Sequence, residues 1–94
     1  MQSSRSKIAE VARLHGWAGE GNRAPHCNDF FTRGSVTIEI LYYQPQDSVR
    51  CAEARGVPET DGVFMAGRGH VIEVRQRDKD KAQTIIGWLT KYGE

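Results

Sequence analysis

The feature that most constrains the fold is a change of hydrophobic period in the last third of the chain. From His70 to Gln76, apolar and polar residues alternate, which places successive side chains on opposite faces of a strand. Beyond Asp80, apolar residues recur every three or four positions, as they do along one stripe of a helix. This stripe consists of Ala82, Ile85, Ile86, Leu89 and Tyr92. Because the strand and the helix each have an apolar surface to cover, we expect them to pack together.

Two more strands are predicted upstream of this unit. The segment from Gly34 to Tyr43 alternates most clearly, with Val36, Ile38, Ile40 and Tyr42 on an apolar face and Leu41 and Tyr43 on a mixed one. After a turn at 44–47, Ser48 to Ala54 is predicted to return as a strand. A short helix is the alternative there, because alanine and glutamate are weak strand formers. For 63–65 we predict a brief extra strand or a plug.

The first third of the chain predicts a helix followed by irregular chain. Ser3 to His15 has helical periodicity, with Ser3 or Ser4 as the cap and Gly16 as the stop. We expect Trp17 to fold back onto the core. The glycines, asparagines and proline of 18–33 favour a loop, with Phe30 or Phe31, or both, inserted beneath the sheet as its anchor.

These elements predict an α+β fold in the order helix, three-stranded antiparallel sheet, helix (α-β-β-β-α), with both helices on one sheet face. At 94 residues, 1–94 is expected to form a single domain. Gly87 lies inside the final helix at a cost of about 1 kcal/mol relative to alanine. The predicted compensation is a close approach of this helix to a neighbouring backbone.

Composition narrows the classes of function. The chain has 13 basic and 12 acidic residues and a net charge of +1, whereas dedicated nucleic-acid binders usually have a basic surplus. No run approaches the roughly 18 apolar residues of a membrane span, and the start of the chain lacks the apolar stretch of a signal peptide. We therefore expect a cytoplasmic protein with no membrane partner. Cys27 and Cys51 are predicted to be free thiols, with a bridge between them as the alternative.

Residues able to bind a metal or perform nucleophilic catalysis are few and scattered. His26 and Cys27 are adjacent, but tetrahedral zinc needs four ligands, and His15, Cys51 and His70 stand singly. A catalytic pair of cysteine and His70 would need flanking groups that activate the thiolate, and neither cysteine has them. We therefore predict no metal, no cofactor and no enzymatic activity.

The densest basic cluster surrounds the last strand and the start of the final helix. It can be interpreted as a nucleic-acid-binding surface or as a solvated face with cross-strand ion pairs, such as Arg75 near Glu39, and we favour the second interpretation. The members of this basic cluster are Arg68, Arg75, Arg77, Lys79 and Lys81.

Three short runs resemble small uncharacterised proteins of actinobacterial phages. Those proteins share an early helix ending in Gly-Trp, a strand led by Arg-Gly and a closing helix with Trp-Leu. The corresponding runs here are Ser6 to Trp17, Thr32 to Gly34 and Ile85 to Leu89. The resemblance implies a phage origin and a host-cytoplasm context.

The predicted element order also resembles the double-stranded RNA-binding domain. In that family, a basic cluster at the start of the last helix contacts phosphates, and Lys79 and Lys81 occupy this place. Asp78 and Asp80 alternate with these lysines, and the turn at 44–47 lacks the Gly-Pro-X-His element of the family. The resemblance supports the predicted topology more than it supports binding of duplex RNA.

The leading hypothesis is a small non-enzymatic interaction module, phage-encoded, that binds a host or phage protein. Leu41 and Tyr43, on the open sheet face, are the candidate contacts for this partner. A homodimer through an exposed strand edge is also predicted, because unpaired strand amides and carbonyls favour pairing. The alternative function is a nucleic-acid-binding domain that uses the basic cluster.

Overall fold

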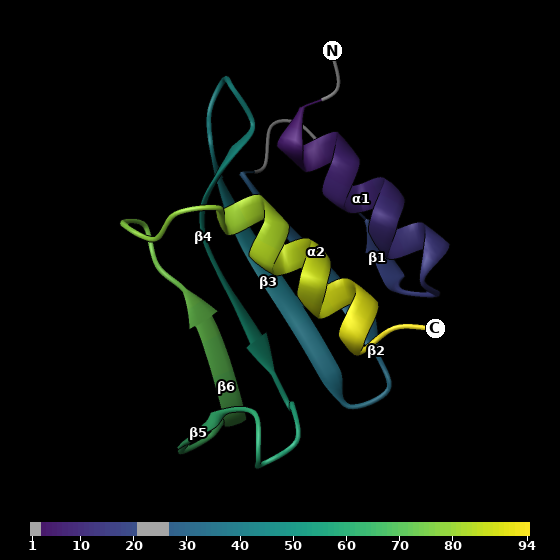
Figure 1. Cartoon of the computed structure of the whole chain (residues 1–94), viewed down its shortest axis with the longest axis vertical. Coiled ribbons are helices and arrows are strands. Elements are labelled where there is room, and N and C mark those ends of the chain that lie inside the picture. Colours follow the sequence, from purple (N-terminus) through teal and green to yellow (C-terminus); the bar gives the residue numbers. More distant parts are fainter. Residues whose placement is uncertain (1–2, 21–26) are drawn as a thin grey trace.

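The computed structural model describes residues 3–20 and 27–94. In this part of the chain, two helices, α1 (Ser4–Leu14) and α2 (Lys81–Lys91), lie side by side on one face of a twisted antiparallel sheet (Figure 1). The strands are β1 (Ala18–Glu20), β2 (Asn28–Arg33), β3 (Val36–Tyr43), β4 (Ser48–Arg55), β5 (Val63–Met65) and β6 (Gly69–Val74).

Within the described residues, the sheet has six strands in the order β1-β2-β3-β4-β6-β5. The α+β class is confirmed, but the predicted three-stranded sheet and the order α-β-β-β-α are wrong. The three predicted strands are β3, β4 and β6, which are neighbours at the centre, and the segment from Ser48 is a strand rather than a helix. β5 confirms the brief extra strand at 63–65, whereas β1 and β2 come from residues predicted to be irregular.

The β2 strand was missed because its helix-facing side carries a carboxylate. Asp29 and Phe31 are buried, at 1% and 3% exposure, while Phe30 between them is 43% exposed. A hydrophobic pattern assigns aspartate to the solvent side, so the alternation of this strand was not recognisable from the sequence. Of the two predicted anchors, only Phe31 lies beneath the sheet.

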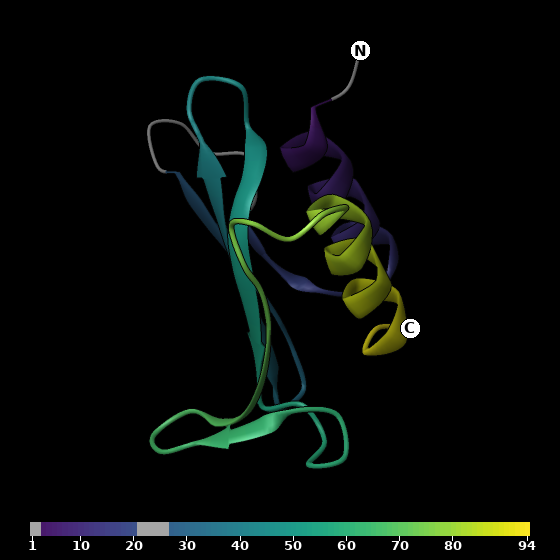
Figure 2. The same cartoon turned by 60° about the vertical axis from the view of Figure 1, so that its left-hand side comes forward.

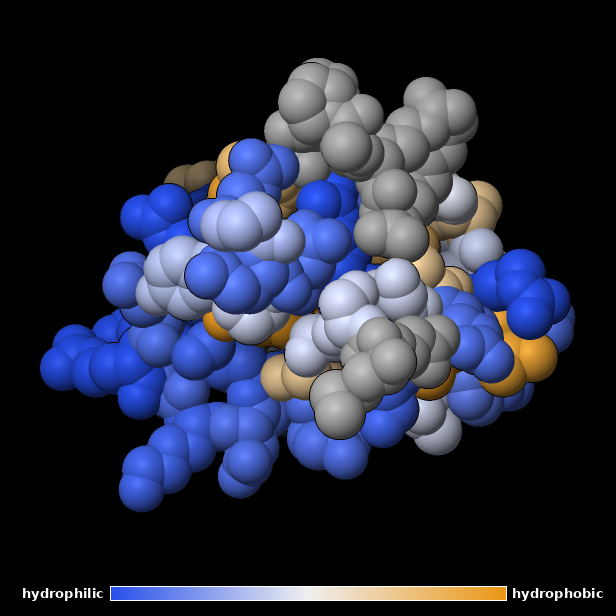
Figure 3. All heavy atoms as spheres, turned by 90° about the horizontal axis from the view of Figure 1, so that it is seen from above, coloured by the Kyte–Doolittle hydropathy of each residue, from blue (hydrophilic) through white to orange (hydrophobic). Residues whose placement is uncertain are grey.

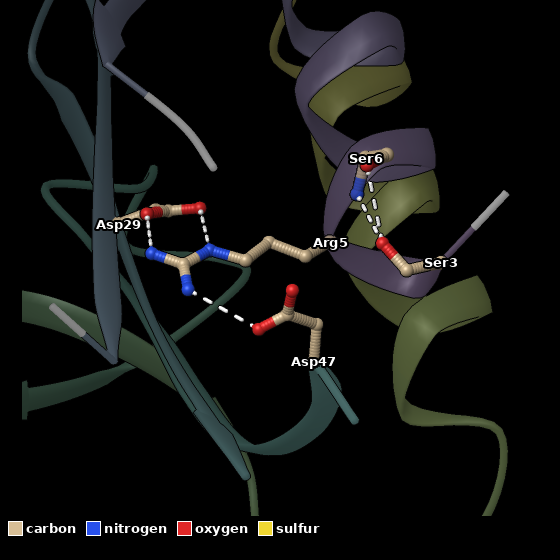
Figure 4. Close-up of polar contacts among 5 residues, drawn as sticks. All are labelled: Ser3, Arg5, Ser6, Asp29 and Asp47. Atoms are coloured by element: carbon tan, nitrogen blue, oxygen red, sulfur yellow. Dashed lines mark hydrogen bonds and ion pairs between the residues drawn. The ribbon is translucent and has the colours of Figure 1, made fainter. Parts of the chain in front are cut away.

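A buried ion pair explains why Asp29 can face the helices. Arg5 of α1 donates from Nε to Asp29 Oδ2 at 3.1 Å and from Nη2 to Oδ1 at 2.7 Å (Figure 4). Its Nη1 also donates to Asp47 Oδ1 at 3.3 Å, and its guanidinium lies 4.9 Å from the Tyr42 ring centroid. Bidentate, charge-assisted pairs of this kind are directional as well as strong. Arg5 therefore fixes α1 against both β2 and the turn between β3 and β4.

Arg5 remains charged although its side chain is only 2% exposed. The hydrogen bonds with Asp29 raise the pKa of Arg5, and burial lowers it by less. Burial also raises the pKa of the neighbouring Tyr42 hydroxyl, with a smaller contribution from Asp29. The cluster is therefore one cation held by two carboxylates beside a neutral phenol.

The core lies between the helices and the sheet, and its β3 contribution confirms the predicted apolar face. Trp17 folds back into this core as predicted, and its Nε1 donates to the Leu89 carbonyl oxygen at 3.0 Å. This bond links the chain after α1 to the last turns of α2. The buried residues of β3 are Val36, Ile38, Ile40 and Tyr42, and those of the helices include Ile8, Ala12, Ile85, Trp88 and Leu89.

The two helices begin differently. Ser3 caps α1, and its side chain accepts a hydrogen bond from the Ser6 amide at 3.1 Å. Asp80 occupies the cap position of α2 but makes no capping bond. Asp78 instead accepts from the Arg75 amide at 2.7 Å, in a turn that ends β6 before the predicted residue 76.

Gly87 does not have the predicted role. It is exposed on α2, and a methyl group added there would meet no atom within 4 Å, so the expected close approach to a neighbouring backbone is wrong. A close contact does exist just beyond the end of α2, at Gly93. A carbon added there would collide with the Leu89 carbonyl oxygen and the His15 side chain. Neither of the described helices has the length and hydrophobicity needed to cross a membrane.

Removing one partner of the buried ion pair is expected to lower the free energy of unfolding more than replacing both partners does. Arg5→Met or Asp29→Leu alone leaves a buried charge without its main partner, and each should lower the free energy of unfolding by about 3 kcal/mol or more. The double variant replaces both charges with apolar groups and should recover most of this loss. Urea unfolding of the four proteins measures the coupling. Additive losses in the double variant would contradict the assigned interaction.

Candidate functional site

The candidate site is the open face of the sheet, opposite the helices. Figure 2 shows α1 and α2 on the same side of the strands, and among the described residues no helix lies on the other side. On β3, the residues that alternate with the core, Thr37, Glu39 and Leu41, are half-buried and face this open side. Figure 3 views the end of the molecule near the β3–β4 turn. The described residues visible there are mostly hydrophilic, and the hydrophobic ones form small patches.

The register of the central strands aligns three glutamates across the open face. Glu39 of β3 lies directly opposite Glu53 of β4, and Glu53 lies opposite Glu73 of β6. Since neighbouring strands are about 4.8 Å apart, this glutamate row spans about 10 Å. Phe30 of β2 is paired with Glu39 and continues the row with an exposed aromatic ring.

Two of the three carboxylates have cationic partners. Glu53 accepts a hydrogen bond from Arg68 Nη1 at 2.8 Å, and Arg75 Nε lies 3.6 Å from Glu73 Oε2. The side chain of Glu39 has no hydrogen bond or ion pair within residues 3–20 and 27–94. Like charges directly opposite one another on adjacent strands are destabilising. Glu39 therefore lies opposite the Glu53 carboxylate and has no cationic partner of its own among the described residues.

A groove of about 460 Å³ lies along this row, between β3, β4 and β6. All three glutamates line it, together with Leu41 and Cys51, which are opposite one another in register. Next to Cys51, a shift of register leaves Arg50 as an extra residue in β4. Irregularities of this kind redirect side chains, and Arg50 and Arg75 are the two cations that line the groove.

The predicted partner contacts, Leu41 and Tyr43, alternate with buried residues of β3 and face the same side of the sheet. Leu41 lines the groove, whereas Tyr43 lies at the end of β3, is 37% exposed and is absent from the groove lining. Leu41 is therefore the predicted partner contact that lies in the same groove as the glutamate row. Tyr43 is exposed on the same face, beyond the residues that line the groove.

The predicted basic cluster is largely engaged within the protein. Arg68 and Arg75 pair with glutamates of the row, so Arg75 contacts Glu73 rather than the expected Glu39. Lys81 Nζ donates to the carbonyl oxygens of residues 76 and 78 at 3.0 and 3.1 Å. Within the described part of the chain, Arg77 and Lys79 are the members of the cluster without such a partner.

The cysteines and histidines form no assembled centre among the residues that the structure describes. Cys51 faces the open side, and His70 shares the opposite strand face with Ile72, where its ring centroid lies 5.6 Å from that of Phe64. No group of three His, Cys, Asp or Glu in this part of the chain is arranged to hold a metal. His26, considered above as a possible zinc ligand, lies outside the described residues. Cys27 and Cys51 are free, as predicted.

Comparison with known proteins adds no relative to this description. No protein-family model, curated protein or solved structure matches the chain. The function is therefore argued from the geometry of the open face.

The glutamate row was missed because it depends on strand register. Glu39 and Glu73 fall at outward positions of predicted strands, but strict alternation along 48–54 would place Glu53 on the same face as Val49. The extra residue Arg50 leaves Val49 in the core and turns Glu53 to the open face. Their alignment in one row requires the pairing of β3, β4 and β6, which a hydrophobic pattern does not supply. The signal that was available is an outward glutamate in two of the three predicted strands, Glu39 and Glu73.

Removing the unpaired charge from this row should stabilise the fold. Glu39→Gln keeps the shape of the side chain but removes the repulsion from Glu53, so the free energy of unfolding should rise by a few tenths of a kcal/mol. Glu59→Gln, on an exposed loop outside the row, is the matched control and should have no effect. Urea unfolding at low and high salt measures the difference, which should shrink with salt. A loss of stability in Glu39→Gln would show that this carboxylate is satisfied in the folded state.

Proposed function

We propose that this protein is a small non-enzymatic interaction module that binds a host or phage protein through the open face of its sheet. The supporting observation is the groove, where the apolar Leu41 lies beside three carboxylates and two arginines, and neither described helix covers them. Mixed surfaces with an apolar centre and a charged rim are typical of protein interfaces. The phage origin comes from the sequence resemblance and is part of the same proposal.

The alternative is a nucleic-acid-binding domain; the element order that resembled the double-stranded RNA-binding domain is not the one observed. Its support is the pair of exposed cations without partners in the described chain, Arg77 and Lys79. The glutamate row argues against it, because three carboxylates across the open face repel a phosphate backbone. Three of the five residues in the basic cluster are also held by internal contacts.

Affinity purification distinguishes the two functions. From a nuclease-treated lysate of phage-infected actinobacterial cells, the protein should retain one stoichiometric partner. Leu41→Asp should abolish this capture, because it places a fourth carboxylate in the groove. Leu14→Asp is the matched control, since Leu14 is 62% exposed on α1 and lies away from the open face.

Two outcomes would contradict the interaction module. One is capture that Leu41→Asp leaves unchanged. The other is a salt-dependent mobility shift with duplex RNA or DNA that is abolished by Lys79→Glu and Lys81→Glu, which would favour the nucleic-acid alternative.

We also propose that the protein forms a homodimer through the β5 edge. β5 is the last strand of the sheet, it carries no charged residue, and Val63 and Phe64 are 73% and 67% exposed. Edge strands without charge or proline tend to pair with another chain. Light scattering should give a dimer mass that Phe64→Lys converts to the monomer mass. A monomer at high concentration would contradict the dimer without affecting the open-face proposal.

A further inference from the structure

We infer that the protein binds a phosphate monoester in a second hollow of its surface, which shares no lining residue with the groove. This hollow has a volume of about 320 Å³ and lies where the β2–β3 turn, the end of β4 and the β5–β6 turn meet. We call it the arginine hollow, and its lining consists of Ser35, Thr37, Arg55, Gly56, Gly67 and Arg68. Binding there does not depend on the protein partner proposed above.

One carboxylate holds both arginines of the arginine hollow in place. Glu53 Oε1 accepts a hydrogen bond from Arg68 Nη1 at 2.8 Å, and Arg55 Nε lies 3.4 Å from Glu53 Oε2. The Glu53 side chain is 17% exposed, whereas those of Arg55 and Arg68 are 30% and 41% exposed. The two cations are therefore the accessible groups, and together with Glu53 they leave a net charge of +1. Because both guanidiniums are positioned before a ligand arrives, an anion that binds them has little side-chain order to create.

Most hydrogen-bond donors of these arginines remain available to a ligand. A guanidinium has five N–H groups. Arg68 uses Nη1 for Glu53, and Arg55 makes no hydrogen bond through its side chain within residues 3–20 and 27–94. Thr37 lies directly opposite Arg55 in register, and its hydroxyl also has no hydrogen bond in this part of the chain. Donors from β3, β4 and the β5–β6 turn therefore surround one space.

Two glycines keep this space open. Ser35 Oγ donates to the Gly56 carbonyl oxygen at 3.2 Å, and a carbon added at Gly56 would collide with the Ser35 carbonyl oxygen. This close approach joins the β2–β3 turn to the end of β4. Gly67, with φ of 83°, occupies the β5–β6 turn beside Arg68. Since neither glycine has a side chain, the arginine hollow is not filled by the protein itself.

The number and charge of the donors select the class of anion. A phosphate monoester carries nearly two negative charges and three strong acceptor oxygens. Arginine binds phosphate through two parallel N–H groups, so Arg55 and Arg68 can each take an oxygen pair while Thr37 donates to the third side. A carboxylate or a phosphodiester carries one charge and presents two free oxygens. Either of them leaves part of this donor set unused.

The glutamate row restricts the ligand to an isolated phosphate group. The arginine hollow lies at one end of the row, beside Glu53, whose charge is offset by the two arginines. Glu39 is two residues along β3 from Thr37, which is about 7 Å. A nucleic-acid backbone that continued across the sheet would meet Glu39 and then Glu73, and both would repel it. A single monoester avoids them.

The test is a titration of the full, isotope-labelled chain with methyl phosphate at neutral pH and constant ionic strength. Amide shifts should be largest at Thr37, Gly56 and Arg68, and the side-chain Nε–H signals of Arg55 and Arg68 should move with them. Dimethyl phosphate is the matched control ligand, because it is tetrahedral but has one charge and two free oxygens. It should bind more weakly than methyl phosphate.

Variants of the protein test the assigned contacts. Arg68→Gln should weaken binding of methyl phosphate about tenfold, because hydrogen bonds to charged groups are the strong ones. Arg77→Gln removes the same charge from an exposed residue outside the arginine hollow and should change the affinity by less than about twofold. Arg68 lies in an exposed turn, and unchanged core signals would show that the fold of its variant is intact.

The hydroxyl contact has its own matched pair. Thr37→Val keeps the shape of the side chain and removes the donor, so it should weaken binding about threefold. Thr32→Val is the control, since Thr32 is paired with Thr37 across β2 and β3 but does not line the arginine hollow.

The phosphate group belongs either to a small molecule or to a phosphorylated side chain of a protein. A short alanine- and glycine-based peptide with a central phosphoserine distinguishes these sources. Tighter binding of this peptide than of methyl phosphate assigns the phosphate to a protein, whereas equal or weaker binding assigns it to a small monoester. Both outcomes support the site.

Three results would overturn it: no shift at the residues of the arginine hollow, equal binding of dimethyl phosphate, or equal effects of Arg68→Gln and Arg77→Gln. These results are distinct from failure of the interaction module. Capture of a partner that Leu41→Asp abolishes and Arg68→Gln retains would preserve the module whether or not methyl phosphate binds. Binding of methyl phosphate without any captured partner would count against the module alone.

Discussion

The way α1 meets the sheet depends on one buried ion pair between Arg5 and Asp29. Both side chains are almost fully enclosed, and a buried charge is tolerated only where a partner of opposite sign meets it in good geometry. This geometry exists only when α1 lies across the sheet and β2 turns Asp29 toward it. The pair therefore fixes the helix, the orientation of β2 and, through Asp47, the turn that joins the two longest strands.

The same orientation determines the chemistry of the open face. With Asp29 and Phe31 turned inward, β2 pairs with β3 so that Ile38 and Ile40 also face the helices. Side chains alternate along each strand, so Glu39 between them must face outward. A slip of one residue would move every side chain to the other face, which the burial of the core forbids. The apolar core and the glutamate row are consequences of one register.

Much of the fold was predictable from local patterns. Alternation identified the three central strands, helical periodicity identified both helices, and the positions of Ser3 and Trp17 followed from capping and size. β2 was not predictable, because the partner of Asp29 lies 24 residues away in sequence. Leu41 was predictable as an outward apolar residue. The glutamate row and the groove were not, because they require the pairing of strands distant along the chain.

The most direct test is a map of cross-strand nuclear Overhauser effects between backbone protons of β2, β3, β4 and β6. The structure predicts contacts of Asp29 with Ile40, of Glu39 with Glu53 and of Glu53 with Glu73. Contacts of Glu39 with residue 52 or 54 instead would mean a register shifted by one. That result would separate the glutamates, remove the basis of the open-face site and contradict the role assigned to the buried pair.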